Sequence, residues 1–285
     1  MIVVTGGAGF IGSNLISALN RRGETKIAVV DRLDASAKFL NLNALDFVDY
    51  IDHGDTSALD AICANAKAIF HLGACADTTE TDGRYMMENN FTFSKQMLQR
   101  ATRNEIPFVY ASSAAVYGLG KEGFREEKAC ESPLNVYATS KLCIDNYVRA
   151  HLPDFRSPVV GLRFFNVYGP QENHKEAMAS VAFHLFGQLQ GGEAMALFEG
   201  SREFLRDFVY VDDAVAVTLD LFDHRISGIF NCGTGHARSF YDVAANLRDL
   251  EGGGEIASIP FPKHLKGKYQ SHTEADLTRL RAAGC

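Results

Sequence analysis

The chain has 285 residues, of which 46% are hydrophobic and 22% charged, a balance typical of a globular protein rather than a disordered or fibrous one. Its formal charge is −7 and it has no basic tract, which argues against nucleic acid as a partner. Six cysteines without C-x-x-C or zinc-site spacing predict a reducing compartment and no metal site. We expect a cytoplasmic protein, since we find no signal peptide and no membrane-spanning apolar run.

The first two thirds of the chain alternate short apolar runs with amphipathic stretches, the pattern of βαβ units. The apolar runs predict strands at residues 2–5, 27–31, 68–72, 108–112 and 159–164. Apolar residues recur at helical spacing from Ile11 to Leu19 and from Met86 to Leu98. The sequence therefore predicts an α/β fold with a doubly wound parallel sheet of the Rossmann type.

The last third follows a weaker pattern. The polar stretch 119–134 indicates a long loop before a helix that begins near Asn135. Further on we expect a helix over 179–190, short strands at 195–198 and 208–210, and a helix from Asp212. We predict a dinucleotide-binding domain over residues 1–168 with returning segments at about 205–235, and a smaller, mainly substrate-binding lobe over 169–285.

A glycine-rich segment, T-G-G-A-G-F-I-G, runs from Thr5 to Gly12 between the first predicted strand and helix. Gly6, Gly9 and Gly12 permit a tight turn and let backbone N–H groups approach a pyrophosphate, beside the positive end of a helix. Such a string by itself often serves only a turn. Its place after a strand, with Asp31 ending the next strand, favours a dinucleotide site.

The residues after the second strand give conflicting cues about the cofactor. Asp31 could accept hydrogen bonds from an adenosine ribose, as in NAD sites, whereas Arg32 and Lys38 could neutralise the 2′-phosphate of NADP. The alternative is that Arg32 and Lys38 are ordinary solvated surface charges. We favour NADP and keep NAD as the second candidate.

A candidate catalytic pair follows in Tyr137 and Lys141, four residues apart in a predicted helix and therefore on one face of it. We expect the Lys141 ammonium to lower the pKa of the Tyr137 phenol, so that a tyrosinate can take a proton from an alcohol as hydride leaves. Ser113 would hydrogen-bond the reacting oxygen, and Lys141 would also hold the nicotinamide ribose. A Y-x-x-x-K pattern alone is more often a surface pair; the glycine-rich segment makes the catalytic interpretation the better one.

With these motifs in this order, the chain resembles the extended short-chain dehydrogenase/reductase superfamily, and the segment 162–170, L-R-F-F-N-V-Y-G-P, resembles its substrate-side motif. Dehydratases of that superfamily usually place an acidic pair beside the catalytic Ser or Thr. Here Ser113 is followed by Ala114 and Ala115. We therefore expect epimerisation or simple redox chemistry rather than dehydration.

Motifs in both lobes also resemble the ADP-heptose 6-epimerase family: 74–75, 85–90, 174–184, 198–201, 205–210 and 265–270. This family inverts C6 of the heptose in ADP-D-glycero-D-manno-heptose through a 6-keto intermediate, for lipopolysaccharide core synthesis. The resemblance implies that Tyr137 and Lys175 are two bases on opposite sides of the sugar, that NADP stays bound throughout, and that the protein is a homo-oligomer, often a pentamer in this family.

The resemblance further implies two sets of contacts. The cofactor contacts are Gly6, Gly9, Phe10, Ile11, Gly12, Asp31, Arg32, Lys38, His53, Leu72, Gly73, Ala74, Cys75, Asn89, Lys141, Val167 and Lys175. The substrate contacts are Ser113, Asn166, His184, Phe198, Glu199, Gly200, Ser201, Arg206 and Tyr269. A planar, always charged guanidinium at Arg206 suits a diphosphate. Taken alone, Lys175 would be read as a solvated lysine, His184 as a packing histidine and Tyr269 as a core residue.

The chain departs from the family pattern at several positions. Ala138 follows the candidate tyrosine where glycine is common, and His53 stands where a lysine approaches the cofactor phosphate, which weakens the NADP assignment. Leu72 replaces a polar residue, Ala177 replaces a hydroxyl residue, and family members continue for a further helix past Gly284. Two other functions stay open: another nucleotide-sugar 4-epimerase or reductase, and a noncatalytic dinucleotide-binding sensor.

Overall fold

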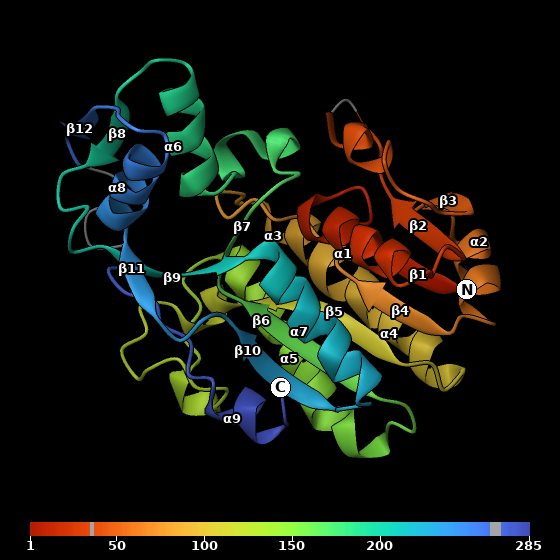
Figure 1. Cartoon of the computed structure of the whole chain (residues 1–285). Helices are drawn as coiled ribbons and strands as arrows, with labels where there is room; N and C mark the ends of the chain where they lie inside the picture. Colours follow the sequence, from red (N-terminus) through yellow and green to blue (C-terminus); the bar gives the residue numbers. More distant parts are fainter. Residues whose placement is uncertain (35–36, 263–268) are drawn as a thin grey trace.

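A seven-stranded parallel sheet forms the centre of the computed structural model, which describes residues 1–34, 37–262 and 269–285 (Figure 1). The strand order is β10-β6-β5-β4-β1-β2-β3. The strands are β1 (Ile2–Thr5), β2 (Ile27–Asp31), β3 (Asp49–Asp52), β4 (Ala68–His71), β5 (Phe108–Ser113), β6 (Val159–Phe164) and β10 (Gly228–Cys232). The chain runs outward from β1 to β3 and then returns to β4 on the other side of β1, which creates the crevice where doubly wound folds bind ligands. The predicted Rossmann-type fold is confirmed.

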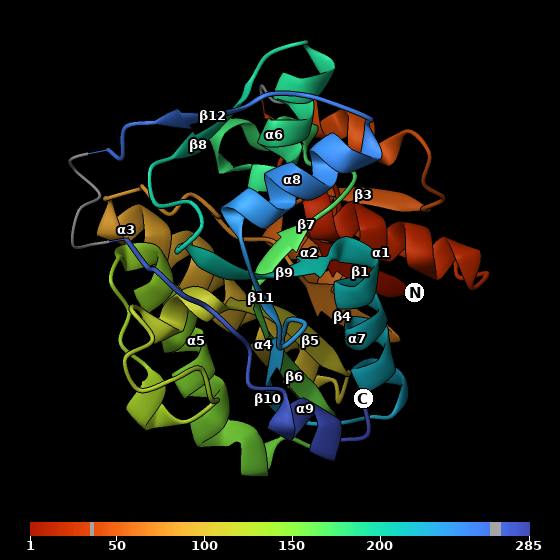
Figure 2. The same ribbon diagram turned by 60° about the vertical axis from the view of Figure 1, so that its left-hand side comes forward.

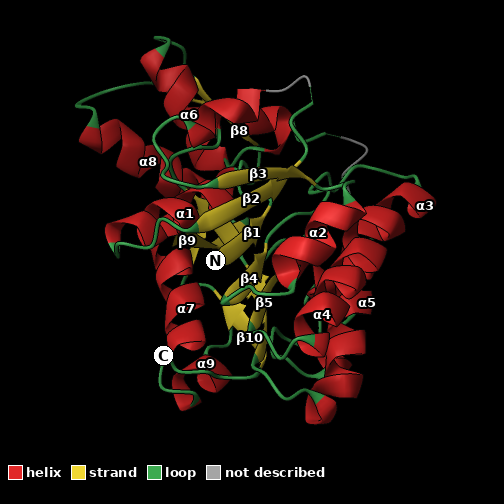
Figure 3. Ribbon diagram, turned by 90° about the vertical axis from the view of Figure 1, so that its right-hand side faces the viewer, coloured by secondary structure: helices red, strands yellow, loops and turns green. Residues whose placement is uncertain are grey.

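Helices cover both faces of this sheet (Figure 3). One face packs against α1 (Phe10–Arg21) and α7 (Val211–Asp223), and the other against α2 (Thr56–Cys63), α4 (Phe93–Arg103) and α5 (Val136–His151). Because both faces are covered, all residues of β1, β2 and β6 are buried. That continuous burial explains why these strands are nearly continuous apolar runs in the sequence, with Arg163 of β6 as an exception.

Four elements of the central domain depart from the predicted ones. β4 ends one residue before the expected position 72, and β5 continues one residue further, to Ser113. Two strands were not predicted: β3, an edge strand in which Ile51 is the buried residue, and β10, which comes late in the chain and pairs with β6. α5 begins at Val136, close to the expected position, because the Asn135 side chain accepts a hydrogen bond from the Ala138 N–H at 2.8 Å.

The segment before α4 contains a wide helical turn. A short helix α3 (Gly83–Met86) passes into the π-helical turn η2 (Met87–Thr92), which then continues as α4. The extra residue of a π turn displaces side chains relative to an α-helix and commonly marks functional sites. Here it carries Asn90, which is fully buried.

The C-terminal lobe is built around two small sheets (Figure 2). The first joins β7 (Asn166–Tyr168), β9 (Leu205–Tyr210) and β11 (Ala237–Ser239), and the second pairs β8 (Met195–Phe198) with β12 (Ile256–Ile259). Helices α6 (Val181–Gln190) and α8 (Phe240–Leu250) pack against β8 around Leu185, Met195, Leu197 and Ala244.

In the last third of the chain β8 lies where it was expected, and three other predicted elements begin one to three residues away from the expected position. α6 begins at Val181 rather than 179, since Ser180 caps it, and β9 begins at Leu205 rather than 208. α7 begins at Val211, one residue before the expected Asp212. The remaining helices are α9 (Thr278–Ala282) and the 3₁₀ turns η1 (Ala37–Leu42), η3 (Ala114–Tyr117), η4 (Lys128–Cys130), η5 (Leu152–Asp154) and η6 (Asn173–Met178). Among the helices in the described ranges, none has both the length and the apolar character needed to cross a bilayer.

Candidate active site

The glycine-rich loop packs too tightly for side chains at two positions. A Cβ on Gly6, whose φ is +68°, would lie 2.6 Å from the backbone nitrogen of Gly73, and one on Gly12 would lie 2.1 Å from the carbonyl oxygen of Gly6. Both neighbours are backbone atoms, which cannot move aside as a flexible side chain could. The loop therefore presents bare backbone and the start of α1 to the cleft, the arrangement that receives a pyrophosphate.

Beside this loop lies a cavity of about 350 Å³. Most predicted cofactor contacts line it: Gly6, Gly9, Phe10, Ile11, Gly12, Asp31, Lys38, Leu72, Gly73, Ala74 and Lys175. A smaller adjoining cavity of about 110 Å³ adds Arg32, His53, Cys75 and Asn89. The described residues thus supply a continuous groove whose shape and backbone donors fit a nicotinamide dinucleotide.

The charges at the adenosine end of the groove are partly paired with each other. The buried Asp31 carboxylate accepts hydrogen bonds from the Ala8 N–H at 2.8 Å and from Lys38 Nζ at 2.6 Å. Arg32 Nε lies 2.8 Å from a carboxylate oxygen of Asp34. The Nδ1 atom of His53 is buried without a hydrogen bond in the described part of the chain, and it lies 3.5 Å from a carboxylate oxygen of Asp52.

A second cavity of about 350 Å³ opens at the carboxyl ends of β5 and β6. Ser113, Tyr137, Lys141, Asn166 and Lys175 line it, together with Val167 of β7. It shares Phe10, Ile11, Leu72, Ala74 and Lys175 with the groove described above, so the two spaces adjoin. The structure therefore gathers all four predicted catalytic residues at one place next to the dinucleotide groove.

Tyr137 and Lys141 lie on one face of α5, as their spacing predicts. The phenol is hydrogen-bonded to Ser113, which belongs to β5 rather than following it. Lys141 Nζ donates to the carbonyl oxygen of Ala111 at 2.8 Å and lies 6.0 Å from the centre of the Tyr137 ring. Lys141 is thus hydrogen-bonded to β5, and its side chain also lines the cavity.

The expectation that Lys141 lowers the pKa of the Tyr137 phenol is wrong. Burial raises the pKa of Tyr137, and the hydrogen bond with Ser113 opposes this only in part. Burial also lowers the pKa of Lys141 to about 8, against the opposing charge of Asp145. The ammonium donates to the Ala111 carbonyl, and the loss of hydration on burial is the largest influence on the pKa of the phenol.

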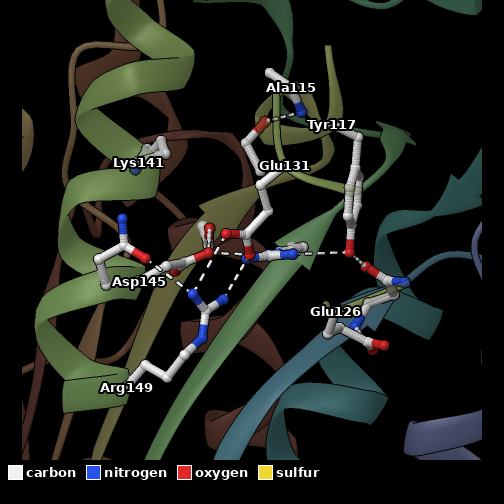
Figure 4. A network of polar contacts seen from close by, with 12 residues as sticks. Ala115, Tyr117, Glu126, Glu131, Lys141, Asp145 and Arg149 are labelled. Carbon is white, nitrogen blue, oxygen red and sulfur yellow. Dashed lines mark hydrogen bonds and ion pairs between the residues drawn. The ribbon is translucent and has the colours of Figure 1, made fainter. Parts of the chain in front are cut away.

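A buried network of charges underlies α5 and was missed in the sequence analysis (Figure 4). Asp145, one helical turn after Lys141, accepts hydrogen bonds from the Tyr110 hydroxyl at 2.8 Å, Ser112 Oγ at 2.9 Å and Arg163 Nε at 2.9 Å. It ties α5 to β5 and β6, and so fixes Tyr137 relative to Ser113. The available signal was a charged residue, Arg163, inside an otherwise apolar strand.

Asn90 makes a similar connection on the cofactor side. Its side chain accepts from the Cys75 N–H at 2.8 Å, donates to the Cys75 carbonyl at 3.0 Å and donates to Ser140 Oγ at 3.1 Å. Ser140 Oγ in turn donates to the Tyr137 carbonyl at 2.7 Å. The loop after β4 and the helix that carries Tyr137 are therefore held together through one buried amide.

Lys175 enters the cavity from a different segment, η6. Its Nζ lies 3.5 Å from a carboxylate oxygen of Glu172 and 5.0 Å from the centre of the Phe10 ring. Tyr137 and Lys175 therefore reach one cavity from α5 and η6, respectively.

The remaining predicted substrate contacts lie away from the described lining of this cavity. Gly200 and Ser201 line a separate space of about 250 Å³ in the C-terminal lobe, Phe198 and Glu199 are at the end of β8, and His184 is exposed on α6. Arg206 is buried, donates to the Leu205 and Gln270 carbonyls, and lies 5.0 Å from the Tyr269 ring centre. Residues 265–268 of the motif that includes Tyr269 fall outside the described residues.

Comparison with known proteins agrees with this geometry. In solved structures, the chain is similar to the ADP-L-glycero-D-manno-heptose-6-epimerase of Helicobacter pylori, at 32% identity over 98% of this chain and 87% of that chain, with a TM-score of 0.85. It is also similar to the UDP-N-acetylglucosamine 4-epimerase of Methanobrevibacter ruminantium M1, at 26% identity over 100% and 91% of the two chains, with a TM-score of 0.88.

A third similar structure is the UDP-glucuronic acid 4-epimerase of Bacillus cereus in complex with NAD, at 25% identity over 99% of this chain and 91% of that chain, with a TM-score of 0.81. Residues 2–233, more than half of the chain, match the NAD dependent epimerase/dehydratase family. The chain therefore belongs to the NAD dependent epimerase/dehydratase family.

Proposed function

We propose that the protein is a nucleotide-sugar epimerase that inverts C6 of the heptose in ADP-D-glycero-D-manno-heptose, as a step of lipopolysaccharide core synthesis. The observation that carries this proposal is the meeting of Tyr137 and Lys175 in one cavity beside the dinucleotide groove. The similarity to the Helicobacter pylori heptose epimerase over nearly the whole chain supports it.

Inversion at an exocyclic carbon explains why two proton-transferring groups are useful. Once C6 is a ketone, its carbonyl can rotate about the bond to the ring and present its other face. A proton must then return to an oxygen that has moved to the other side of the site. Tyr137 and Lys175 lie on separate elements, so each can exchange a proton with that oxygen in one of its two positions.

The chain's own groups have distinct roles in this scheme. A nicotinamide dinucleotide, when bound, accepts hydride from the sugar carbon and returns it. Ser113 holds the Tyr137 phenol by a hydrogen bond and is placed to bind the reacting oxygen. Burial favours the neutral form of Tyr137, so in the chain itself this phenol is set to donate a proton. Asn166 offers both a donor and an acceptor to sugar hydroxyls.

Dehydration is the less favoured chemistry of this family for the chain. Elimination needs an acid beside the catalytic serine, and Ser113 is followed by the apolar Ala114 and Ala115 in the turn η3. We also favour NADP over NAD, because Arg32 and Lys38 line the cavity at the adenosine end. A homo-oligomer and a cytoplasmic location stay predictions.

Product analysis tests the proposal. The purified protein is incubated with ADP-D-glycero-D-manno-heptose and, separately, with UDP-galactose, and the product configuration is assigned by NMR. We expect inversion at C6 of the heptose and no inversion at C4 of galactose. Inversion of UDP-galactose alone would favour a 4-epimerase, and bound dinucleotide without any turnover would favour a sensor.

A further inference from the structure

Glu172 is an acidic residue with 1% of its surface exposed, in the loop between β7 and α6. Its Oε1 atom accepts hydrogen bonds from the Gly169 N–H at 3.1 Å and from Ser180 Oγ at 2.8 Å. Its Oε2 atom accepts from the Ser180 N–H at 2.6 Å and lies 3.5 Å from Lys175 Nζ. A buried carboxylate is tolerated only when it is bonded and paired in this way, and the charged one of these four donors is Lys175.

These contacts close the loop at both ends. Gly169 directly follows β7, and Ser180 is the cap of α6, where its Oγ accepts from the Phe183 N–H at 3.2 Å. One side chain, Glu172, therefore joins the strand that enters the loop to the helix that leaves it. The loop conformation depends on this carboxylate more than on regular secondary structure.

The backbone on either side of Lys175 is strained. Gln171 has a φ of 76°, and Glu176 has a φ of 47° with a ψ of −127°. Residues other than glycine rarely adopt these values, and each such position costs about 1–3 kcal/mol. Strain of this kind persists only where surrounding contacts fix the backbone. The hydrogen bonds of Glu172 with Gly169 and Ser180 join the two ends of the strained segment.

The loop also lies against the glycine-rich segment. The Asn14 side chain donates to the Pro170 carbonyl at 3.0 Å, and the Asn41 side chain donates to the Ala8 carbonyl at 3.0 Å and to the Gln171 carbonyl at 3.3 Å. A lysine on a flexible four-carbon stem has many rotamers in water. Here its ammonium has the Phe10 ring beside it and the Glu172 carboxylate behind it.

We propose that Glu172 is a positioning residue for Lys175: it holds the strained loop closed and fixes the ammonium at the wall of the catalytic cavity. This inference rests on the proposed function, because it assigns Glu172 a role only through the proton transfer given to Lys175. Glu172 itself is not among the described residues that line either cavity; it contacts the cavity wall only through Lys175 and Ser180.

The first test is Glu172→Gln, which keeps the size of the side chain and removes its charge. We expect the kcat for C6 inversion to fall about 10- to 100-fold, since a misplacement of about 1 Å of a reacting group can cost that much. We expect the KM for the heptose substrate to change less than about twofold, because the ammonium acts in the proton-transfer step and contributes little to ground-state binding of the sugar. Glu176→Gln is the matched control: it removes an exposed charge next to Lys175 and should leave kcat unchanged.

The decisive test is a double-mutant cycle with Lys175→Met. If Glu172 acts through Lys175, the double variant Glu172→Gln/Lys175→Met inverts C6 at the same rate as Lys175→Met alone. Removing one acid–base group lowers the rate by about 10²–10⁴-fold, so residual inversion is followed over long incubations. If Glu172→Gln does not fold, the cycle is run with Glu172→Asp, which keeps the charge at a shorter reach.

Three results separate this inference from the proposed function. A further tenfold loss in the double variant, or wild-type kcat in Glu172→Gln, would overturn the positioning role while leaving the epimerase assignment intact. Wild-type kcat in Lys175→Met would instead remove the two-base function itself. Equal rates of the double and the Lys175→Met variants, with a slow Glu172→Gln variant, would support both.

Discussion

Replacing Arg163 should show most clearly how much the buried charge network beneath α5 contributes to the free energy of unfolding. Its side chain has no exposed surface. Nε donates to Asp145 at 2.9 Å, Nη1 donates to the Tyr117 hydroxyl at 3.0 Å, and Nη2 pairs with Glu131. Burial by itself lowers the pKa of the guanidinium, but Asp145, Tyr117 and Glu131 together outweigh this and raise the pKa above its ordinary value. Arg163 is therefore charged and offsets two buried carboxylates.

We predict that Arg163→Met lowers the free energy of unfolding by about 3–5 kcal/mol, the usual cost of removing one partner from a buried ion pair. Asp145 would keep only neutral donors, the hydroxyls of Tyr110 and Ser112. The assay is urea unfolding at pH 7. The matched control is Arg149→Met: that side chain is 34% exposed and its partner Glu131 would keep Arg163, so we expect a loss below about 1 kcal/mol.

The pH dependence distinguishes charge from packing. Burial raises the pKa of Glu131, but hydrogen bonds from Arg149 and Arg163 outweigh it and hold the pKa below its ordinary value. Such a carboxyl stabilises the fold above its unfolded pKa, and this contribution is lost as pH falls through the folded pKa. The stability deficit of Arg163→Met should therefore narrow as the pH falls below the ordinary carboxyl pKa of 4.5. A loss below about 1 kcal/mol at pH 7, or a deficit that stays the same below pH 4.5, would refute the electrostatic reasoning.

Three further variants test other parts of the structure. Gly12→Ala places a Cβ 2.1 Å from a backbone oxygen and should abolish copurification of dinucleotide, which is measured by the absorbance released on denaturation. The control Gly253→Ala has open space around it and should leave the dinucleotide content unchanged. Glu176→Gly should raise the urea midpoint, because relief of about 1–3 kcal/mol of strain exceeds about 0.5–1 kcal/mol of added chain entropy. Burial lowers the pKa of His71 to about 3, so as the pH falls the unfolded chain takes up the proton before the folded one. The free energy of unfolding should therefore fall by about 1.4 kcal/mol per pH unit below about pH 6.5. His71→Gln should remove this pH dependence.

Each of these predictions has a result that contradicts it. Full dinucleotide content in Gly12→Ala would show that the loop can shift to accept a side chain. A lower urea midpoint for Glu176→Gly would show that the backbone at this position is not strained. Identical pH–stability curves for the wild type and His71→Gln would mean that His71 can be protonated within the fold.

Three of the strands that were predicted from the sequence are buried on both faces. β1, β2 and β6 have every residue buried, so their apolar runs mark the observed ends. β3 carries the sequence D-Y-I-D at the sheet edge, where burial falls mainly on Ile51, and no such run exists. α8 begins with a capping box of Ser239 and Asp242, a local signal that the sequence analysis did not use.

The candidate site likewise contains residues that local motifs predict and residues whose roles depend on contacts distant in the sequence. The glycine-rich loop and the pair Tyr137 and Lys141 lie in continuous motifs, so spacing alone brings each group together. Lys175 could be predicted only from the family resemblance. Glu172 resembles any solvated acid in a polar loop, and its importance depends on a strained backbone that no local preference specifies. The Tyr137 pKa depends on burial, which the sequence does not reveal.

The central claim is that Tyr137 and Lys175 act on one C6 centre from two elements of the fold. The most direct measurement is the C6 configuration of the product, followed by NMR, for the wild type and for Tyr137→Phe and Lys175→Met separately. The account predicts that the wild type converts the D-glycero substrate to the L-glycero epimer and that each variant is slower by about 100-fold or more. Inversion at the wild-type rate by both variants would contradict it.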